Sequence, residues 1–271
     1  MEVFGGLNAG GTNAVTADAF LLGTRGTLDV QTGAALTIST GYVLGGATLD
    51  GHTNLALGAS LIMASLLTRV DYHASLAAGL GSNAVVSRGS FDCAIDSNTR
   101  FDLSLATLSL DGTGIEQTLE VMSTDIGADA SGLDRSMAGH YPIGTLEIGS
   151  APTTVRLVDA RDNDNLGQLT CEALYIDTLR INAGSRLINT TCRIYYNTLI
   201  NNGTVDVPEN LIPLGQACIG DYNQDGGIDG ADVEAFFADW EVAAPGADVN
   251  QDGGIDGSDV DTFFERWQAG C

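Results

Sequence analysis

A loop of twelve residues occurs twice near the end of this chain, at residues 221–232 and 248–259. Both copies carry oxygen-bearing side chains at loop positions 1, 3, 5, 9 and 12, and both have glycine at position 6. This pattern constrains the fold, because the backbone must turn sharply at the glycine for the side chains to converge. An acidic linker rich in Asp and Gly is the alternative, and two copies in register argue against it.

The spacing of the oxygen atoms is that of an EF-hand-type calcium loop, in which position 7 adds a backbone carbonyl. A hard cation that binds six to eight oxygens accounts for every one of these positions. The sequence therefore predicts two Ca²⁺ ions. The expected ligands are Asp221, Asn223, Asp225, Gly227, Asp229 and Asp232 in the first loop, and Asp248, Asn250, Asp252, Gly254, Asp256 and Asp259 in the second.

Large apolar residues follow each loop with the spacing i, i+3, i+4, i+7, which places them on one face of a helix. Turn-forming residues, without such a pattern, precede the loops at 211–220 and 242–246. Each unit is therefore predicted to be a loop followed by one helix. The two apolar faces consist of Val233, Phe236, Phe237 and Trp240, and of Val260, Phe263, Phe264 and Trp267.

Residues 218–271 resemble a dockerin in their duplicated loops, single exit helices, position-12 aspartates and C-terminal placement. The ending 269–271, with Cys218 before the first loop, is similar to the GC-type variant of that family. The resemblance implies a calcium-folded module that docks onto a cohesin-like or cell-surface protein receptor. Positions 10 and 11 hold Gly230–Ala231 and Gly257–Ser258, whereas cellulosomal type I dockerins carry Ser-Thr-like pairs there. A disulfide between Cys218 and Cys271 would join the ends of this module.

The distribution of charge also separates residues 218–271 from the rest of the chain. Residues 218–271 contain 13 acidic residues and one arginine, and so contribute −12 to a net charge of −24. Such dense carboxylates repel one another, so we expect calcium binding and folding of this segment to be coupled. Nucleic acid is not an expected partner, because the chain has no basic patch that could neutralise phosphates.

Residues 1–212 are expected to form a separate β domain, joined by a linker at 213–217 to the module at 218–271. Short alternating apolar runs between turn formers predict strands, and a loose Gly-x-x-Leu-x-Ile theme favours a right-handed parallel β-solenoid. A β-sandwich is the alternative. Residues 64–96 and 123–141 are the least regular and are expected to be loops or lateral insertions. The predicted strands lie at 27–30, 35–38, 47–50, 55–57, 60–63, 101–105, 107–110, 146–148, 155–158, 173–176, 178–181, 186–188, 193–195 and 204–207.

Other polar groups in the β domain form no motif of comparable strength. The acidic run 159–165 could bind a further Ca²⁺, but it lacks the glycine turn, and a solvated loop is the favoured interpretation. His52, His73 and His140 are expected at surface or loop positions. No nucleophile elbow, phosphate-binding loop or zinc motif is present. Acidic and basic residues that could serve polysaccharide chemistry exist without diagnostic spacing, namely Asp71, Asp102, Arg100 and Arg156.

The remaining cysteines allow one more bridge. Cys171 and Cys192 could lie on adjacent coils and pair, leaving Cys93 odd, although buried free thiols are the alternative for all three. An oxidising compartment outside the cytoplasm would permit these disulfides. The calcium loops also indicate a location outside the cell, because free Ca²⁺ is abundant there.

Residues 1–6 have no secretory signal peptide, so we expect a processed or truncated product or a misassigned start. No apolar stretch is long enough to span a membrane.

Two functions follow as hypotheses. The preferred one is a non-enzymatic extracellular calcium-binding protein whose dockerin-like module anchors a β-solenoid to a protein receptor. The alternative is a carbohydrate-active component of a polysaccharide-degrading assembly, either a hydrolase, a lyase or a sugar-binding module, because dockerins often accompany such proteins.

Overall fold

The computed structural model describes residues 1–40, 46–86, 88–149, 152–167, 171–214, 219–223, 227–250 and 253–269. The chain divides into two compact units. The first comprises Met1–Asp125 and Ser131–Pro213, and the second comprises Ile126–Ala130 and Leu214–Cys271.

The first unit is mainly β and contains two sheets, with short 3-10 turns η1 (Asn98–Arg100) and η3 (Pro208–Asn210). A further 3-10 turn, η2 (Ala130–Leu133), begins at the last residue of the segment 126–130 and continues into the first unit. One sheet has nine strands in the order β1 (Glu2–Val3), β4 (Phe20–Leu22), β7 (Ala47–Leu49), β10 (Leu67–Val70), β13 (Ser90–Cys93), β15 (Glu116–Glu120), β17 (Thr154–Val158), β19 (Arg186–Ile188) and β21 (Thr204–Val205). The other follows the order β2 (Gly6–Ala9), β5 (Thr27–Val30), β8 (His52–Leu55), β11 (Ser75–Ala78), β14 (Phe101–Leu110), β12 (Asn83–Val86), β9 (Ser60–Met63), β6 (Ala35–Thr40) and β3 (Thr12–Ala17). From β14 it continues through β16 (Ile143–Ile148), β18 (Leu174–Ile181), β20 (Ile194–Asn201) and β22 (Leu211–Pro213).

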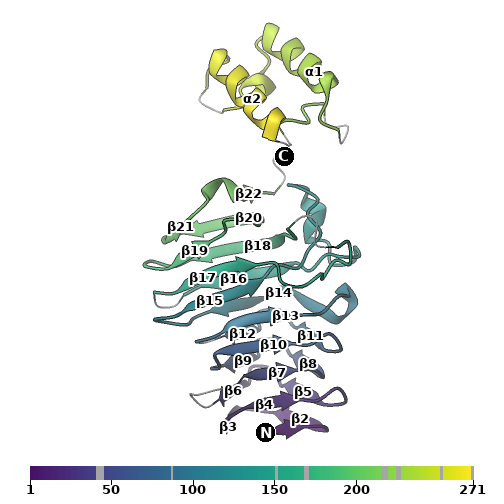
Figure 1. The fold of residues 1–271 in the computed structure, drawn as a ribbon, viewed down its shortest axis with the longest axis vertical. Helices are drawn as coiled ribbons and strands as arrows, with labels where there is room; N and C mark the ends of the chain where they lie inside the picture. Colours follow the sequence, from purple (N-terminus) through teal and green to yellow (C-terminus); the bar gives the residue numbers. More distant parts are fainter. Residues whose placement is uncertain are drawn as a thin grey trace. The chain divides into compact units, whose positions relative to one another are not determined.

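Pairing between these strands is parallel throughout the described residues, and successive strands of a sheet lie one above another in Figure 1. In the first sheet each strand up to β13 pairs with the strand three elements later in the chain. The long strand β14 joins two ladders, since Phe101 and Asp102 pair with β11 while residues 107–110 pair with β12.

Parallel register places equivalent apolar side chains above one another, and these columns form the core. One column runs through strands β6, β9, β12, β14, β16 and β18, and each of its members is almost completely buried. Successive side chains of a strand point to opposite faces of the sheet, so every second residue of each short strand enters this core and the residues between them are partly exposed. The members of the column are Leu36, Leu61, Ala84, Leu108, Leu146 and Leu179.

Two segments interrupt the regular succession of strands, residues 121–142 after β15 and residues 159–173 after β17. The two insertions contact each other, because Ser123 and Ala173 form an antiparallel bridge and the Tyr141 hydroxyl donates to the Asn163 carbonyl at 2.7 Å. The expected irregularity of 123–141 is thus confirmed. The same expectation for 64–96 is wrong, because that segment contains strands β10 to β13. Their strand conformation depends on parallel pairing with segments distant in the sequence, as in the pairing of β11 with β8 and β14.

The second unit contains helices α1 (Gly230–Glu241) and α2 (Gly257–Ala269), with a 3-10 turn η4 (Pro245–Ala247) between them. Each helix follows one of the two loops, as the apolar spacing predicts. Phe236, Ala247 and Phe263 form a small core that is separate from the core of the β unit. The Phe236 and Phe263 rings stack with centroids 4.2 Å apart.

Candidate calcium-binding sites

Asp232, at position 12 of the first loop, is completely buried at the start of α1. Its Oδ1 accepts the Asn223 backbone N–H at 3.1 Å, and its Oδ2 accepts the Asp229 backbone N–H at 2.8 Å. Asp229 in turn caps the helix, since its Oδ1 accepts the Ala231 N–H at 2.7 Å. One carboxylate therefore joins loop positions 3, 9 and 12 around a common centre.

The second loop repeats this arrangement. Asp259 is completely buried, its Oδ1 accepts the Asn250 N–H at 3.2 Å, and its Oδ2 accepts the Asp256 N–H at 2.9 Å. Ser258 donates to Asp256 through its backbone N–H at 2.8 Å and through its hydroxyl at 2.6 Å. These two bonds lower the pKa of Asp256, so that carboxyl remains ionised and able to bind a cation.

The second loop also contains a buried oxygen without a hydrogen-bond partner. Asp248, at position 1, accepts the Gly253 N–H through Oδ2 at 3.1 Å, while its buried Oδ1 has no partner. Gly253, at position 6, has φ +88°, a conformation that side chains other than glycine rarely adopt. An orphaned carboxylate oxygen is costly unless a cation satisfies it, so the donor set fits Ca²⁺.

The two halves of the unit are tied together reciprocally. Trp240 at the end of α1 donates its ring N–H to the carbonyl of Asp256 at 3.2 Å, in the second loop. Trp267 in α2 donates to the carbonyl of Asp229 at 3.0 Å, in the first loop. Each helix thus positions the loop of the other half.

The structure therefore brings together positions 3, 9 and 12 of both loops, and positions 1 and 6 of the second. Gly227 and Gly254 lie half-buried at position 7, and Asp221 lies half-buried at position 1 of the first loop. The predicted ligands Asp225 and Asp252 lie outside the described residues, as do both cysteines of the expected Cys218–Cys271 disulfide.

A second acidic group lies in the β unit, within the insertion 159–173. Carboxylate oxygens of Asp162, Asp164 and Glu172 all lie within 4.8 Å of one another. Glu172 is 5% exposed, and burial together with the charges of Asp164 and Asp159 raises its pKa to about 8. Sequence reasoning missed Glu172, because no spacing connects it to the acidic run 159–165.

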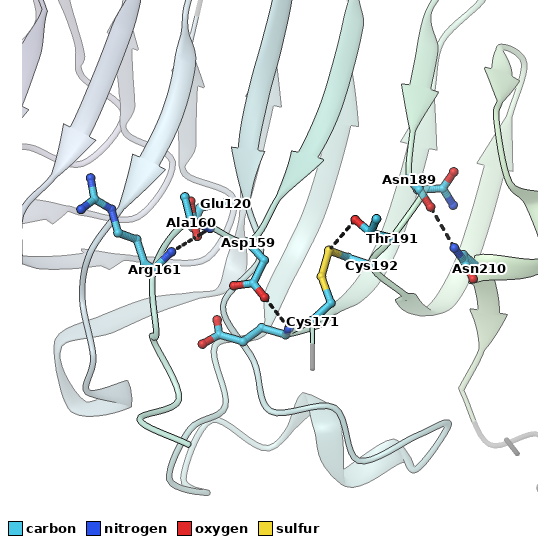
Figure 2. The surroundings of a disulfide bond; sticks show 10 residues. Glu120, Asp159, Ala160, Arg161, Cys171, Asn189, Thr191, Cys192 and Asn210 are labelled. Atoms are coloured by element: carbon cyan, nitrogen blue, oxygen red, sulfur yellow. Dashed lines mark hydrogen bonds between the residues drawn. A yellow bond between two sulfur atoms is a disulfide. The ribbon is translucent and has the colours of Figure 1, made fainter. Parts of the chain in front are cut away.

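Another buried carboxyl, that of Glu120, holds the start of the insertion. Glu120 in β15 is 2% exposed, and its Oε1 accepts the backbone N–H groups of Ala160 at 2.7 Å and Arg161 at 2.8 Å (Figure 2). Burial raises the pKa of Glu120 to about 7, and the charges of Asp92 and Asp159 act in the same direction.

Cys171 and Cys192 form a disulfide with their Cα atoms 5.5 Å apart, which confirms the pairing considered from the sequence. Figure 2 shows Asp159 beside Cys171 at this bridge. Cys93 is a buried free thiol, and burial raises its pKa to about 12. A thiol that stays protonated and inaccessible is unreactive, so Cys93 is a core residue.

The other candidate residues have separate partners. Asp102 pairs with Arg135, Arg156 with Glu116 at 2.6 Å, and Arg100 with Asp96. Ion pairs that are this exposed contribute at most about 1 kcal/mol each to stability.

The three histidines also lie in different surroundings. His52 contacts the Ser75 hydroxyl at 2.7 Å, and His73 lies 3.8 Å from Asp50. His140 belongs to the expected insertion, but it is buried and stacks on Tyr175 with ring centroids 5.9 Å apart.

No family model matches this chain, and no curated protein or solved structure matches it either. None of the helices in the described parts of the chain combines the length and apolar character that crossing a membrane requires. Inference about function therefore depends on the residues of the chain and their geometry.

Proposed function

We propose that the C-terminal unit is a dockerin-like module that binds two Ca²⁺ ions and attaches the β unit to a cohesin-like or cell-surface protein outside the cell. The observation that carries the proposal is the duplicated arrangement around Asp232 and Asp259. Both carboxylates are completely buried, and both hold backbone N–H groups of loop positions 3 and 9. Both loops have this geometry, and Asp248 has a buried oxygen without a hydrogen-bond partner. These observations favour calcium-binding loops over the alternative of an acidic linker.

Electrostatics supports coupling of metal binding to folding in this module. Its small core rests mainly on Phe236 and Phe263, while the segment 218–271 carries a net charge of −12. Without cations the loop carboxylates repel one another, and a core of this size offers little to oppose that repulsion. Calcium supplies the missing stabilisation when it is bound.

For the attached unit we propose a right-handed parallel β-solenoid. Support comes from parallel pairing of strands that recur along the chain and from the columns of equivalent apolar residues such as Leu61 and Leu108. Sandwich folds are built from antiparallel strands, so parallel pairing favours the solenoid over that alternative. The Cys171–Cys192 bridge supports an oxidising, extracellular location.

Loop positions 10 and 11 are proposed to contact the receptor. Gly230, Ala231, Gly257 and Ser258 are all exposed at the starts of the two helices. The family resemblance assigns recognition to these positions. Their small side chains leave the receptor close access to the helix ends.

The calcium role is tested by tryptophan fluorescence of the full chain. The chain has two tryptophans, Trp240 and Trp267, and both lie in the C-terminal unit. Titrating Ca²⁺ into protein treated with EDTA should shift the emission to the blue, because folding of the unit packs both indole rings against its core and partly removes them from water. An emission spectrum that does not respond to millimolar Ca²⁺ would refute the proposal.

Matched variants locate that response. Asp221→Ala with Asp248→Ala removes position 1 from both loops and should abolish the calcium-dependent shift. Asp261→Ala removes an exposed acidic residue of α2 that has no loop position, and the shift should remain. Equal responses in the two proteins would assign the effect to general screening of negative charge.

Receptor docking is tested separately with immobilised cohesin domains or with cell-surface extracts in Ca²⁺ and in EDTA. Ala231→Arg should abolish or strongly weaken capture while leaving the fluorescence response intact, because Ala231 contacts Asp229 only through its backbone N–H. Capture that is equally strong in EDTA would contradict a calcium-folded docking module.

The carbohydrate-active alternative makes a different prediction for the β unit. If that unit acts on or binds polysaccharide, the chain should cleave or retain pectin, alginate or a related polymer with or without Ca²⁺ in the C-terminal loops. A screen of such polymers distinguishes the two functions.

A further inference from the structure

In the insertion 159–173, the described residues 159–167 and 171–173 are held around acidic side chains by several hydrogen bonds. Glu172 Oε1 accepts the backbone N–H groups of Asn163 at 2.6 Å and Asp164 at 3.0 Å. Asp162 Oδ1 accepts the Gly167 N–H at 3.1 Å, and Asp164 Oδ1 accepts the Leu166 N–H at 2.9 Å. Backbone N–H groups therefore bind one oxygen of each carboxylate and hold the three groups in fixed positions.

The base of the insertion is anchored to the β core. Asn163 is 1% exposed, and its amide donates to the carbonyls of Cys93 at 3.1 Å and Ile95 at 2.7 Å. The disulfide fixes Cys171, the residue before Glu172. Holding the segment in one conformation costs conformational entropy, whereas a solvated surface loop keeps that freedom.

One oxygen within the cluster has no protein partner. Glu172 Oε2 is completely buried and accepts no hydrogen bond. Glu172 also forms a group with Asp162 and Asp164, in which one carboxylate oxygen of each residue lies within 4.8 Å of the others. The nearby Arg161 guanidinium is engaged with Asp92 at 2.8 and 3.0 Å. A buried carboxylate oxygen without a partner, beside two further carboxylates, requires either a cation or a proton.

We propose that Asp162, Asp164 and Glu172 bind a divalent cation of the calcium class, at a site separate from the two C-terminal loops. Three carboxylates with oxygen donors only suit a hard cation rather than zinc or copper, which prefer nitrogen and sulfur ligands. Asp162 is exposed, Asp164 is half-buried and Glu172 is buried, so the cation reaches the group from the solvent side of Asp162 and water completes its coordination.

Counting bound calcium in the full chain by equilibrium dialysis at about 1 mM Ca²⁺, within the range for extracellular modules, tests the proposal. Glu172→Gln keeps the shape of the side chain and should lower the count by one ion per chain. In the Asp221→Ala, Asp248→Ala background, one ion should remain, and Glu172→Gln should remove it. The second comparison is independent of calcium binding by the C-terminal loops.

Controls separate loss of the site from loss of folding. Asp177→Asn removes one exposed negative charge from β18 and should leave the count unchanged. Asp164→Asn is a second variant of the site, and the far-UV circular dichroism of each variant should match that of the wild type. A position-1 double variant that binds no calcium, or a folded Glu172→Gln protein with an unchanged count, would overturn the proposal.

Discussion

At the scale of single residues, the buried aspartates at loop position 12 have two tasks. Asp232 binds the backbone N–H groups of Asn223 and Asp229 in the loop itself, and it is also the expected calcium ligand. These tasks respond differently to substitution, because hydrogen bonding needs an acceptor whereas calcium binding needs a charge.

Asp232→Ala should therefore be more damaging than Asp232→Asn in the absence of calcium. Alanine leaves two buried N–H groups without an acceptor, at a cost of about 1–3 kcal/mol for each unsatisfied group. Asparagine retains one acceptor oxygen and places its amide NH2 against the other N–H group, so it should lose one of the two hydrogen bonds as well as calcium affinity. Urea unfolding followed by tryptophan fluorescence, in EDTA and in Ca²⁺, measures both quantities. Identical unfolding of the two variants in EDTA would argue against the hydrogen-bonding task.

A different residue, Glu120, should contribute to the way the stability of the β unit depends on pH. The pKa of Glu120 is raised to about 7 by burial, so the folded state retains a proton that the unfolded state releases near pH 4. Its contribution is fully present below the unfolded pKa and is lost as pH rises through 7. The loss is on the order of 3 kcal/mol between pH 4 and pH 8.

Glu120→Gln keeps the acceptor for the Ala160 and Arg161 N–H groups but does not titrate. The free energy of unfolding of the variant, measured in EDTA by circular dichroism, should fall less than that of the wild type over this pH range. Parallel pH profiles for the two proteins would show that Glu120 is ionised throughout.

At the scale of elements, the disulfide connects the insertion 159–173 to the segment before β20. Cys171 and Cys192 are 21 residues apart. A loop of that length loses enough entropy in the unfolded chain to stabilise the fold by about 3 kcal/mol. Replacing both cysteines by alanine should lower the free energy of unfolding of the β unit by about this amount, as measured with urea. Cys93→Ala provides a comparison, because it removes a buried thiol without opening a loop.

Local pattern was sufficient for some elements and insufficient for others. Strands β9 and β19 have the bounds that alternation predicts, since Ser60–Met63 and Arg186–Ile188 lie between clear turn residues. Strand β11 was missed because Ser75–Ala78 has one large apolar residue, Leu76. Its strand conformation depends on pairing with β8 and β14, and pairing between distant segments leaves no trace in local sequence.

The candidate sites also divide into those that local sequence predicts and those that depend on contacts between distant segments. The C-terminal loops could be found because all their ligands occur within twelve consecutive residues in each copy. Glu172 could not be assigned to the acidic run 159–165, because chain folding and the adjacent disulfide bring it to Asp162 and Asp164. The reciprocal tryptophan bonds were likewise invisible, since they join residues of different repeats.

At the scale of the whole molecule, two separate cores and an uneven charge distribution predict two unfolding transitions. The β unit buries a continuous apolar core, whereas the C-terminal unit has a small core within a highly negative segment. Adding EDTA should lower the transition seen by tryptophan fluorescence by far more than the transition seen by far-UV circular dichroism. A single transition with coincident probes in EDTA would indicate that the units unfold together.

The reciprocal bonds of Trp240 and Trp267 also have a consequence for affinity. Because each helix holds the position-9 carbonyl of the opposite loop, filling one loop orders part of the other before its own ion arrives. The second ion then meets a lower entropic cost, which is positive cooperativity without any change of global state. Trp240→Phe should reduce the Hill coefficient for Ca²⁺ toward unity, so the module would change from an abrupt sensor of external calcium to a gradual one.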